Sequence, residues 1–362
     1  MQADIDAIYS PHVTFLPPIT HENDSSERDA LTEIDPAGFY IRPPPKPHEL
    51  ASEITDDSQL FQTIHMGAAV VDETKWKLVV SGLVERPFSI SFEQLKRMPR
   101  TSITSFHECY GSPIAPPVHA LWRIGNVRWT GVRLVDLLRL ARPKPEAQFV
   151  WSQGLDSGTF AGVSADRYEK DLPMAKALTP EVLIAYEMNG APLDKKRGGP
   201  VRMVVPGYFG TNSTKWLCRL SLQDHRATGP FTTTFYNEID PTDPAGERKR
   251  PVWHVEPNSM IVTPEPDAIL QGPEVNVTGR AWGCEEIQNV NLSVDGGQTW
   301  LPRSVVQLRP RKEFEWQLFE ATVSIAKPGR YRFAARATDK VGLAQQLTGR
   351  RNHVHIVEVD VT

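Results

Sequence analysis

The sequence has little of what membrane, disulfide-rich and nucleic-acid-binding proteins need. No apolar run approaches the roughly 20 residues of a membrane-spanning helix, so no membrane association is expected. Three cysteines far apart, Cys109, Cys218 and Cys284, do not make a disulfide framework and fit a reducing compartment. A net charge of −4 gives no basis for nucleic acid binding. The first residues lack the pattern of a secretory signal, so we expect a cytoplasmic protein.

Length and composition indicate three segments. A chain of 362 residues is too long for one ordinary core, so two compact units are expected. Residues 1–55 mix acidic and proline-rich stretches, which is typical of an extended arm that wraps the body or a neighbour. We expect an α+β catalytic domain over residues 56–254 and an immunoglobulin-like β-sandwich over residues 255–362.

The α+β domain shows both helix and strand patterns. Ser91 is placed to cap a short helix, and Leu134, Leu137 and Ala141 follow the spacing of an amphipathic helix. Strands are expected in KWKLVVSGLV, TSITSFHE, QFVWSQG and VRMVV. The second of these strands runs into a loop at Gly111. Because chemistry often lies where a rigid element meets a loop, this strand end is a candidate site.

Beyond about residue 255 the chain changes to short alternating strands separated by turns. The strands are EVNVTGRAWG, VNLSVDGGQTW, FEWQLFEATV and GRYRFAARATDKVG. This spacing is typical of a β-sandwich. Asp295, Gly296 and Gly297 predict a hairpin turn, because glycine accepts the positive φ that such turns require.

Cys109, next to His107, is open to three interpretations from its residues alone. It could be a buried structural cysteine, the commonest role of a cysteine in a reducing compartment. It could be a thiol nucleophile with His107 or His119 as its base. It could also be a thiolate ligand of a soft metal. No second cysteine lies near enough for a Cys-x-x-Cys pair, so such a metal would take its other ligands from a cofactor.

Four segments carry a resemblance to a known family. They are the strand that bears Cys109, RWTGVRLVDLL, EVLIAYEMNGAPLDKKRGGPVRMVVPGYFGTNSTKWLCRLSL and VNLSVDGGQTW. Over these segments the chain resembles the sulfite oxidase family of molybdopterin enzymes. The resemblance implies a molybdopterin-binding α+β domain, a dimerising immunoglobulin-like domain and a homodimer. It also implies a molybdenum–molybdopterin cofactor and two-electron oxygen-atom transfer on a small-molecule substrate.

The resemblance also assigns roles to single residues. Cys109 becomes the one protein ligand of molybdenum, and a soft thiolate suits that role. Tyr236 becomes the active-site tyrosine, with His107 beside the metal ligand. The residues matched to cofactor binding are His65, Asp156, Arg197, Arg202, Asn212, Ser213, Thr214 and Lys215. Cations with hydroxyl and amide donors at a glycine-containing loop also fit a phosphate site on chemical grounds.

The sequence departs from the family where sulfite-binding arginines are expected. Thr63, Pro113 and Ile114 stand in their places. Each lost charged hydrogen bond weakens anion binding by roughly 1.5–3 kcal/mol, so sulfite is disfavoured. His107, Tyr110, Tyr236 and Arg167 remain, which suits a neutral, aromatic or less highly charged substrate.

No haem module or dinucleotide fingerprint is evident, so a separate electron acceptor or donor is expected. Three alternatives stay open at this level: a reductase of sulfoxide-type substrates on the same fold, a binding protein without metal, and a thiol hydrolase.

Overall fold

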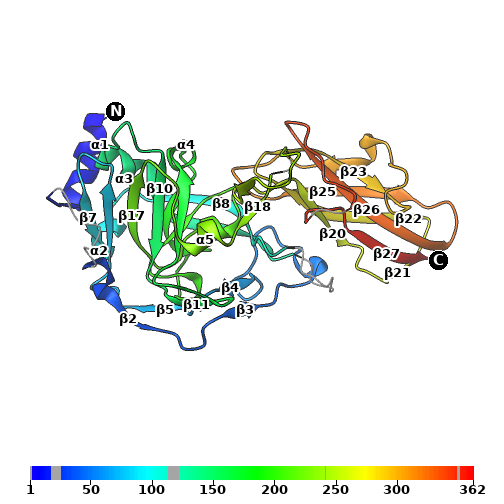
Figure 1. Ribbon diagram of the computed structural model, residues 1–362. Helices are drawn as coiled ribbons and strands as arrows, with labels where there is room; N and C mark the ends of the chain where they lie inside the picture. Colours follow the sequence, from blue (N-terminus) through cyan, green and yellow to red (C-terminus); the bar gives the residue numbers. More distant parts are fainter. Residues whose placement is uncertain (1, 18–25, 113–121, 241, 349–350) are drawn as a thin grey trace.

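The structure, a computed structural model, describes residues 2–17, 26–112, 122–240, 242–348 and 351–362. Figure 1 shows two lobes side by side, with the chain passing from the first lobe in blue and green to the second in yellow and red. No helix of the described residues is long and apolar enough to cross a membrane.

The first lobe contains a six-stranded sheet, in which β17 lies at the centre. In spatial order its strands are β1 (Thr14–Phe15), β7 (Phe88–Ser91), β6 (Lys77–Gly82), β17 (Leu217–Gln223), β10 (Phe149–Gly154) and β13 (Glu169–Pro173). Strands β6 and β17 pair in parallel, and the other neighbours pair antiparallel. The central strand reads LCRLSLQ and is almost wholly buried, as expected for a strand covered on both faces.

A second sheet of the same lobe carries the candidate strand end. Its strands are β15 (Ala191–Pro192), β14 (Leu183–Met188), β9 (Ile124–Arg133) and β8 (Thr101–Glu108), with β16 (Arg202–Val204) paired to β14. Strands β8 and β9 form an antiparallel ladder in which Glu108 lies opposite Ile124. Cys109 therefore follows directly after the last residue of β8.

The helices are short. They are α1 (Gln2–Tyr9), α2 (Phe92–Lys96), α3 (Leu134–Ala141), α4 (Met174–Ala177) and α5 (Pro230–Thr233). Ser91 caps α2 through the backbone N–H of Gln94, which confirms the predicted cap. Leu134, Leu137 and Ala141 are buried, so α3 packs the predicted apolar face into the core.

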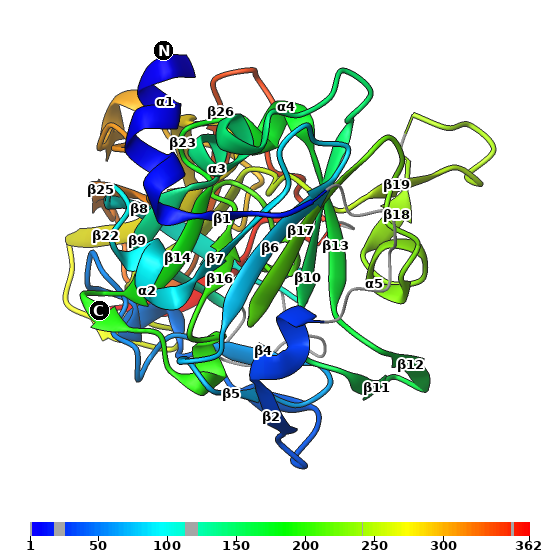
Figure 2. The ribbon, with the colours of Figure 1, turned by 90° about the vertical axis from the view of Figure 1, so that its left-hand side faces the viewer.

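The N-terminal arm wraps around the first lobe. It begins with α1, a helix that was not predicted from the sequence. Figure 2 shows α1 beside α3, where the Tyr9 hydroxyl donates to Asp136 at 2.7 Å. Further along, the buried Glu27 pairs with Arg219 at 2.8 Å. The arm also supplies a strand to two small sheets, which are β2 (Leu31–Ile34) with β5 (Ala69–Val71) and β3 (Tyr40–Arg42) with β4 (Gln62–Ile64). The other small sheets of the lobe are β11 (Gly158–Phe160) with β12 (Val163–Ala165) and β18 (Asn237–Ile239) with β19 (Lys249–Pro251).

The second lobe is a sandwich of two four-stranded sheets, so the predicted α+β domain followed by a β-sandwich is confirmed. One sheet contains β20 (Asn258–Thr263), β22 (Glu274–Trp282), β25 (Gln317–Ser324) and β24 (Val306–Leu308). The other contains β21 (Ile269–Leu270), β27 (Ile356–Val361), β26 (Gly329–Asp339) and β23 (Ile287–Ser293). An apolar core that includes Phe319 and Phe333 belongs to this lobe.

The predicted hairpin at Asp295 is wrong, although the turn exists. Gly296 and Gly297 have positive φ, and the Asp295 carboxylate accepts from the backbone N–H of Thr299 at 2.9 Å. However, β23 before the turn pairs with β26, whereas β24 after it pairs with β25. The turn therefore carries the chain from one sheet to the other, because the two-residue glycine signal specifies a turn and not which strands pair.

A hydrophobic cluster joins the two lobes. Phe106 and Phe209 from the first lobe pack in one cluster with Trp282 and Trp316 from the second, together with Leu50 at the end of the arm. The boundary at residues 254 and 255 stays a prediction, since apolar packing continues across it.

Candidate active site

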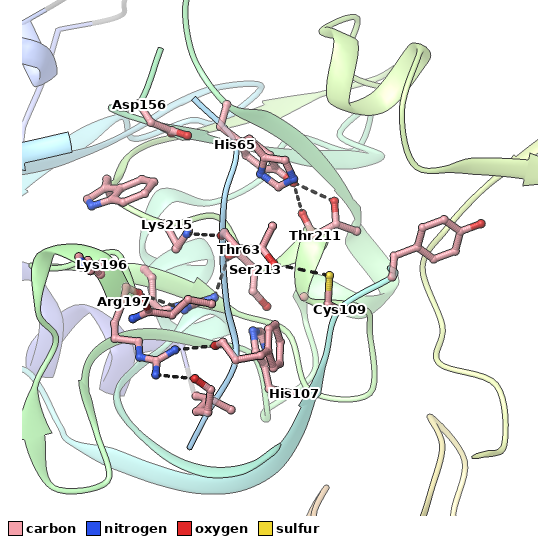
Figure 3. A pocket seen from close by; sticks show the side chains of 18 of the residues that line it. Thr63, His65, His107, Cys109, Asp156, Lys196, Arg197, Thr211, Ser213 and Lys215 are labelled. Atoms are coloured by element: carbon pink, nitrogen blue, oxygen red, sulfur yellow. Dashed lines mark hydrogen bonds between the residues drawn. The ribbon is translucent and has the colours of Figure 1, made fainter. Parts of the chain in front are cut away.

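A cavity of about 760 Å³, part of it open to solvent, lies in the first lobe. The chain reaches it from the end of β8, from the loops after β4 and β10, and from the segments between β15 and β17 (Figure 3). The site residues predicted from sequence that line the cavity are His65, His107, Cys109, Asp156, Arg197, Arg202, Ser213, Lys215 and Tyr236.

Cys109 presents its sulfur to this cavity. Its backbone N–H donates to the carbonyl of Arg123 at 2.9 Å, which extends the β8–β9 ladder by one residue and fixes the side-chain direction. The Sγ atom lies 3.9 Å from the hydroxyl of Thr63 (Figure 3). It also accepts from the backbone N–H of Gly111 at 3.4 Å. Pro113, Ile114 and His119 lie outside the described residues.

Three cations gather at another part of the wall. Arg197 donates from Nε to Asp57 at 2.6 Å and from Nη1 to the carbonyl of Phe61 at 2.7 Å. The Arg202 guanidinium donates to the carbonyls of Arg197 and Ser213 at 3.0 and 3.1 Å. Lys215 Nζ donates to the carbonyl of Thr63 at 2.8 Å (Figure 3).

The surroundings of these cations disfavour their positive charge. Burial, then Arg202, lowers the pKa of Lys215, and burial, then Arg197, lowers the pKa of Arg202. Arginine stays charged in proteins, so its lowered pKa expresses an unfavourable environment and not a lost proton. The buried Nε of Arg202 has no hydrogen-bond partner in the described chain. The cluster is therefore short of negative charge and of acceptors.

The acidic member of the wall is Asp156, in the turn between β10 and β11. Its side chain is buried, and Oδ1 has no partner among the described residues. Burial raises the pKa of this carboxyl group. A buried polar atom without a partner is costly, so this oxygen is a candidate contact for a bound group.

His65 and Tyr236 both line the cavity and are joined by a hydrogen bond between Nε2 and the phenol oxygen. Burial lowers the pKa of His65 to about 3, which keeps the ring neutral at ordinary pH. Burial also raises the pKa of Tyr236, which keeps its hydroxyl protonated. Tyr236 has φ of 57°, an uncommon conformation for a non-glycine residue. This strain at the cavity is consistent with a functional position.

His107 is packed between Phe61 and Trp129, with ring centroids 5.7 and 5.6 Å away. Gly210 approaches this ring so closely that a Cβ there would lie 3.1 Å from it. Burial, then the charge of Arg202, holds the pKa of His107 well below its ordinary value. A side chain at position 210 would therefore require the His107 ring to shift by a few tenths of an ångström.

Two predicted residues do not line the cavity. The Asn212 amide donates to the carbonyls of Phe209 and Val252, and the Thr214 hydroxyl bonds to Ser152 at 2.7 Å. Their roles as cofactor donors stay predictions. Arg167 is also absent from the lining; it donates to Gln153 at 2.7 Å and lies 3.6 Å from Glu27, so its role in the pocket stays a prediction.

Tyr168 was missed from the sequence. Its buried hydroxyl bonds to Thr211, and its ring lies 5.7 Å from that of His65. It stands in a charged stretch, RYEKD, with no motif around it. Only the pairing of β13 with β10 brings it to the cavity wall, so no local signal could have found it.

A protein-only metal site is not present in the described chain, where no three His, Cys, Asp or Glu residues could hold a metal ion together. A metal bound by Cys109 would need its other ligands from a bound group. The cation cluster and the unpartnered Asp156 oxygen fit a cofactor that carries an anionic group and polar ring atoms.

Comparisons with known proteins agree with this arrangement. Residues 65–231 match the oxidoreductase molybdopterin binding domain, and residues 249–354 match the Mo-co oxidoreductase dimerisation domain. Fold and site thus define a two-domain molybdopterin oxidoreductase. The chain belongs to the sulfite oxidase family.

Particular relatives support this conclusion. Sulfite oxidase of Gallus gallus is 31% identical over 319 residues, which cover 81% of this chain and 68% of that protein. Mitochondrial sulfite oxidase of Mus musculus is 31% identical, with 87% of this chain and 61% of that protein covered. The sulfane dehydrogenase SoxCD from Paracoccus pantotrophus has a similar structure, with a TM-score of 0.76, 25% identity and 97% and 89% of the two chains covered.

Proposed function

We propose that this protein transfers an oxygen atom in a two-electron reaction at a molybdenum centre ligated by Cys109. The observation that carries the proposal is the meeting of a cysteine sulfur, a buried cation cluster and a neutral His–Tyr pair in one cavity. Lys215 and Arg202 have environments that disfavour their charge, and a bound anion would relieve that cost.

Different residues of the cavity would contact different parts of such a cofactor. Lys215, Arg202 and Ser213 would face its phosphate, and Asp156 would accept from its pterin ring. Arg197 already makes its hydrogen bonds to the segment of residues 57–61, so its main contribution is to hold that wall.

When bound, the molybdenum cofactor supplies the centre that takes up two electrons. The chain supplies hydrogen bonds and exclusion of water. Tyr236 keeps its proton because burial raises its pKa, so its hydroxyl can donate to a substrate oxygen. His65 holds that hydroxyl in place through its hydrogen bond. The proposal includes a homodimer through the C-terminal lobe, a separate electron partner and a cytoplasmic location. Analytical ultracentrifugation at micromolar concentration should show a dimer, and a monomer would contradict that part.

The test is Cys109→Ser in protein expressed with molybdate. We expect turnover to fall by at least about a thousandfold, because serine cannot provide the soft thiolate, while the fold and much of the pterin are retained. Oxidation of sulfite and reduction of sulfoxides, each with artificial electron carriers, would show the direction. Molybdenum is measured by mass spectrometry.

Cys284→Ser is the matched control, since Cys284 is half-buried and lies outside the cavity. It should leave turnover and molybdenum content unchanged. Full activity in Cys109→Ser, or wild-type protein without molybdenum after growth with ample molybdate, would contradict the proposal.

A further inference from the structure

The register of the β8–β9 ladder places a cation beside Cys109 that the sequence motif does not contain. His107 lies opposite Gly125 and Glu108 opposite Ile124, so Cys109 lies opposite Arg123, as its backbone hydrogen bond to the Arg123 carbonyl shows. Side chains directly opposite each other in an antiparallel pair project from the same face of the sheet. Arg123 therefore extends on the side of the Cys109 sulfur.

The position of Gly111 shows how close the two groups come. A Cβ on Gly111 would lie 2.3 Å from Arg123 Nη1 and 3.7 Å from Cys109 Sγ. Guanidinium and sulfur thus lie close to each other, and the guanidinium occupies the space that a side chain of residue 111 would take. The charge of Arg123 also reaches Tyr236, whose pKa it lowers against the larger effect of burial.

Arg123 is not committed to a structural ion pair within the described chain. Its buried Nε has no hydrogen-bond partner there. Glu108, its nearest acidic neighbour along β8, projects from the other face and accepts from Trp282 Nε1 at 2.8 Å. An arginine held beside a reactive centre without a carboxylate has its charge available to a ligand.

A second arginine near this loop is already engaged. Arg351, from the C-terminal lobe, donates to the carbonyl of Ser112 at 3.0 Å and stacks 4.5 Å from the Tyr110 ring and 4.2 Å from the Phe209 ring. It fixes Tyr110, which lines the cavity with its ring centroid 6.1 Å from that of Tyr236. The surroundings of Cys109 thus combine one available guanidinium, that of Arg123, with aromatic rings that line the cavity.

We propose that Arg123 is the specificity-determining residue of the substrate pocket and selects a substrate with a single oxyanion group and an apolar body, such as an organic sulfinate. This inference rests on the proposed function and names its substrate class. Oxidation of a sulfinate to a sulfonate adds one oxygen atom from water and releases two protons and two electrons. In an assay, two ferricyanide ions accept those electrons, one each.

Binding and turnover test the inference separately. Titration calorimetry on the molybdenum-loaded protein compares two ligands. Benzenesulfonate has one charge and an apolar ring, and it cannot be oxidised further at sulfur. Sulfate is a dianion without an apolar group. Kinetics with ferricyanide use benzenesulfinate, sulfite and the neutral thioanisole. The variants are Arg123→Met, Arg123→Lys and Gly111→Ala, with Arg128→Met, an exposed arginine of the same strand, as the control.

In Arg123→Met we expect the Kd of benzenesulfonate and the KM of benzenesulfinate to rise roughly 10- to 100-fold, the value of one charged hydrogen bond. The KM of thioanisole should stay within about twofold of wild type, because a neutral substrate does not pair with this charge. All values in Arg128→Met should also stay within about twofold, because Arg128 is exposed and remote from the sulfur. Arg123→Lys should fall between, since lysine keeps the charge without the planar fork. Gly111→Ala should weaken benzenesulfonate binding because its Cβ displaces the guanidinium.

Unchanged benzenesulfonate affinity in Arg123→Met would overturn the inference, as would tighter binding of sulfate than of benzenesulfonate by wild type. If Arg123→Met does not fold, unchanged affinity in both Arg123→Lys and Gly111→Ala overturns it equally. Selective loss of benzenesulfonate binding supports the inference even where no substrate turns over, a result that would count against the proposed function alone.

Discussion

The cavity wall of the first lobe and the core of the C-terminal sandwich are both deeply buried, yet they bury opposite kinds of side chain. The core cluster of the sandwich is apolar, and ion pairs such as Arg330 with Glu358 lie on the surface. The cavity wall instead buries the charged groups of Arg202 and Asp156 and half-buries that of Lys215.

The difference shows that the cavity wall lowers the stability of the fold in order to form a binding site. Burial of an apolar side chain stabilises the fold directly, whereas burial of an incompletely paired charge destabilises it by several kcal/mol. The wall of cations is therefore best understood as one half of an interaction whose other half is a ligand. The sandwich core is complete by itself.

The largest expected effect on stability lies in the sandwich. Phe333 is fully buried in β26, so Phe333→Ala should lower the free energy of unfolding by about 3–5 kcal/mol through lost burial and a cavity. Urea unfolding followed by circular dichroism measures this. Val341→Ala, at a position that is 71% exposed, should change little. A similarly small effect of Phe333→Ala would contradict the statement that apolar burial stabilises the sandwich.

In the cavity wall, removal of a side chain should raise the free energy of unfolding instead of lowering it. In cofactor-free protein, Lys215→Met removes a half-buried cation whose charge its environment disfavours, so it should raise the free energy of unfolding by about 1–4 kcal/mol. The same variant should retain much less molybdopterin when the cofactor is supplied, because a phosphate partner is lost. Unfolding experiments and pterin fluorescence of released cofactor give the two values.

The pH dependence sharpens this prediction. Burial lowers the pKa of Lys215 in the folded state, so the unfolded chain binds more protons and the penalty is full at low pH. The penalty fades as pH rises toward 10.5, the ordinary value for lysine. The gain in unfolding free energy from Lys215→Met should therefore shrink as pH rises. A gain that does not change with pH would contradict burial of the lysine charge as its cause.

The smallest effect near neutral pH, and one that grows as pH falls, is expected at His65. Its folded pKa of about 3 lies below its ordinary 6.5, so between these values the unfolded state binds more protons and stability falls as pH falls. His65→Phe should reduce the slope of unfolding free energy against pH by about 1.4 kcal/mol per pH unit at most. Equal slopes in cofactor-free wild type and variant would show that His65 is protonated in the fold.

Much of the architecture could be predicted because it depends on local patterns. The cap at Ser91 and the apolar spacing of α3 are properties of a few neighbouring residues, and the structure confirms both. The turn at Asp295 was equally local, but which strands pair around it was not. Strand pairing depends on contacts far apart in the chain, so that prediction failed.

The candidate site divides in the same way. Cys109, Asp156 and Lys215 could be proposed because each stands in a recognisable motif. Tyr168 and Arg123 could not, since each reaches the site through pairing between strands, β13 with β10 and β9 with β8. Arg167 shows the converse, because a cation close in sequence to the pocket segments turns toward Glu27 of the arm.

The sequence by itself determined the class of this protein, its two kinds of domain and the cysteine around which the site is built, because motifs and periodicity are encoded in short stretches. Only the tertiary structure decided which charges surround that cysteine. A cross-strand partner is chosen by sheet register, and register is set by the packing of the whole lobe and not by the neighbours of any one residue.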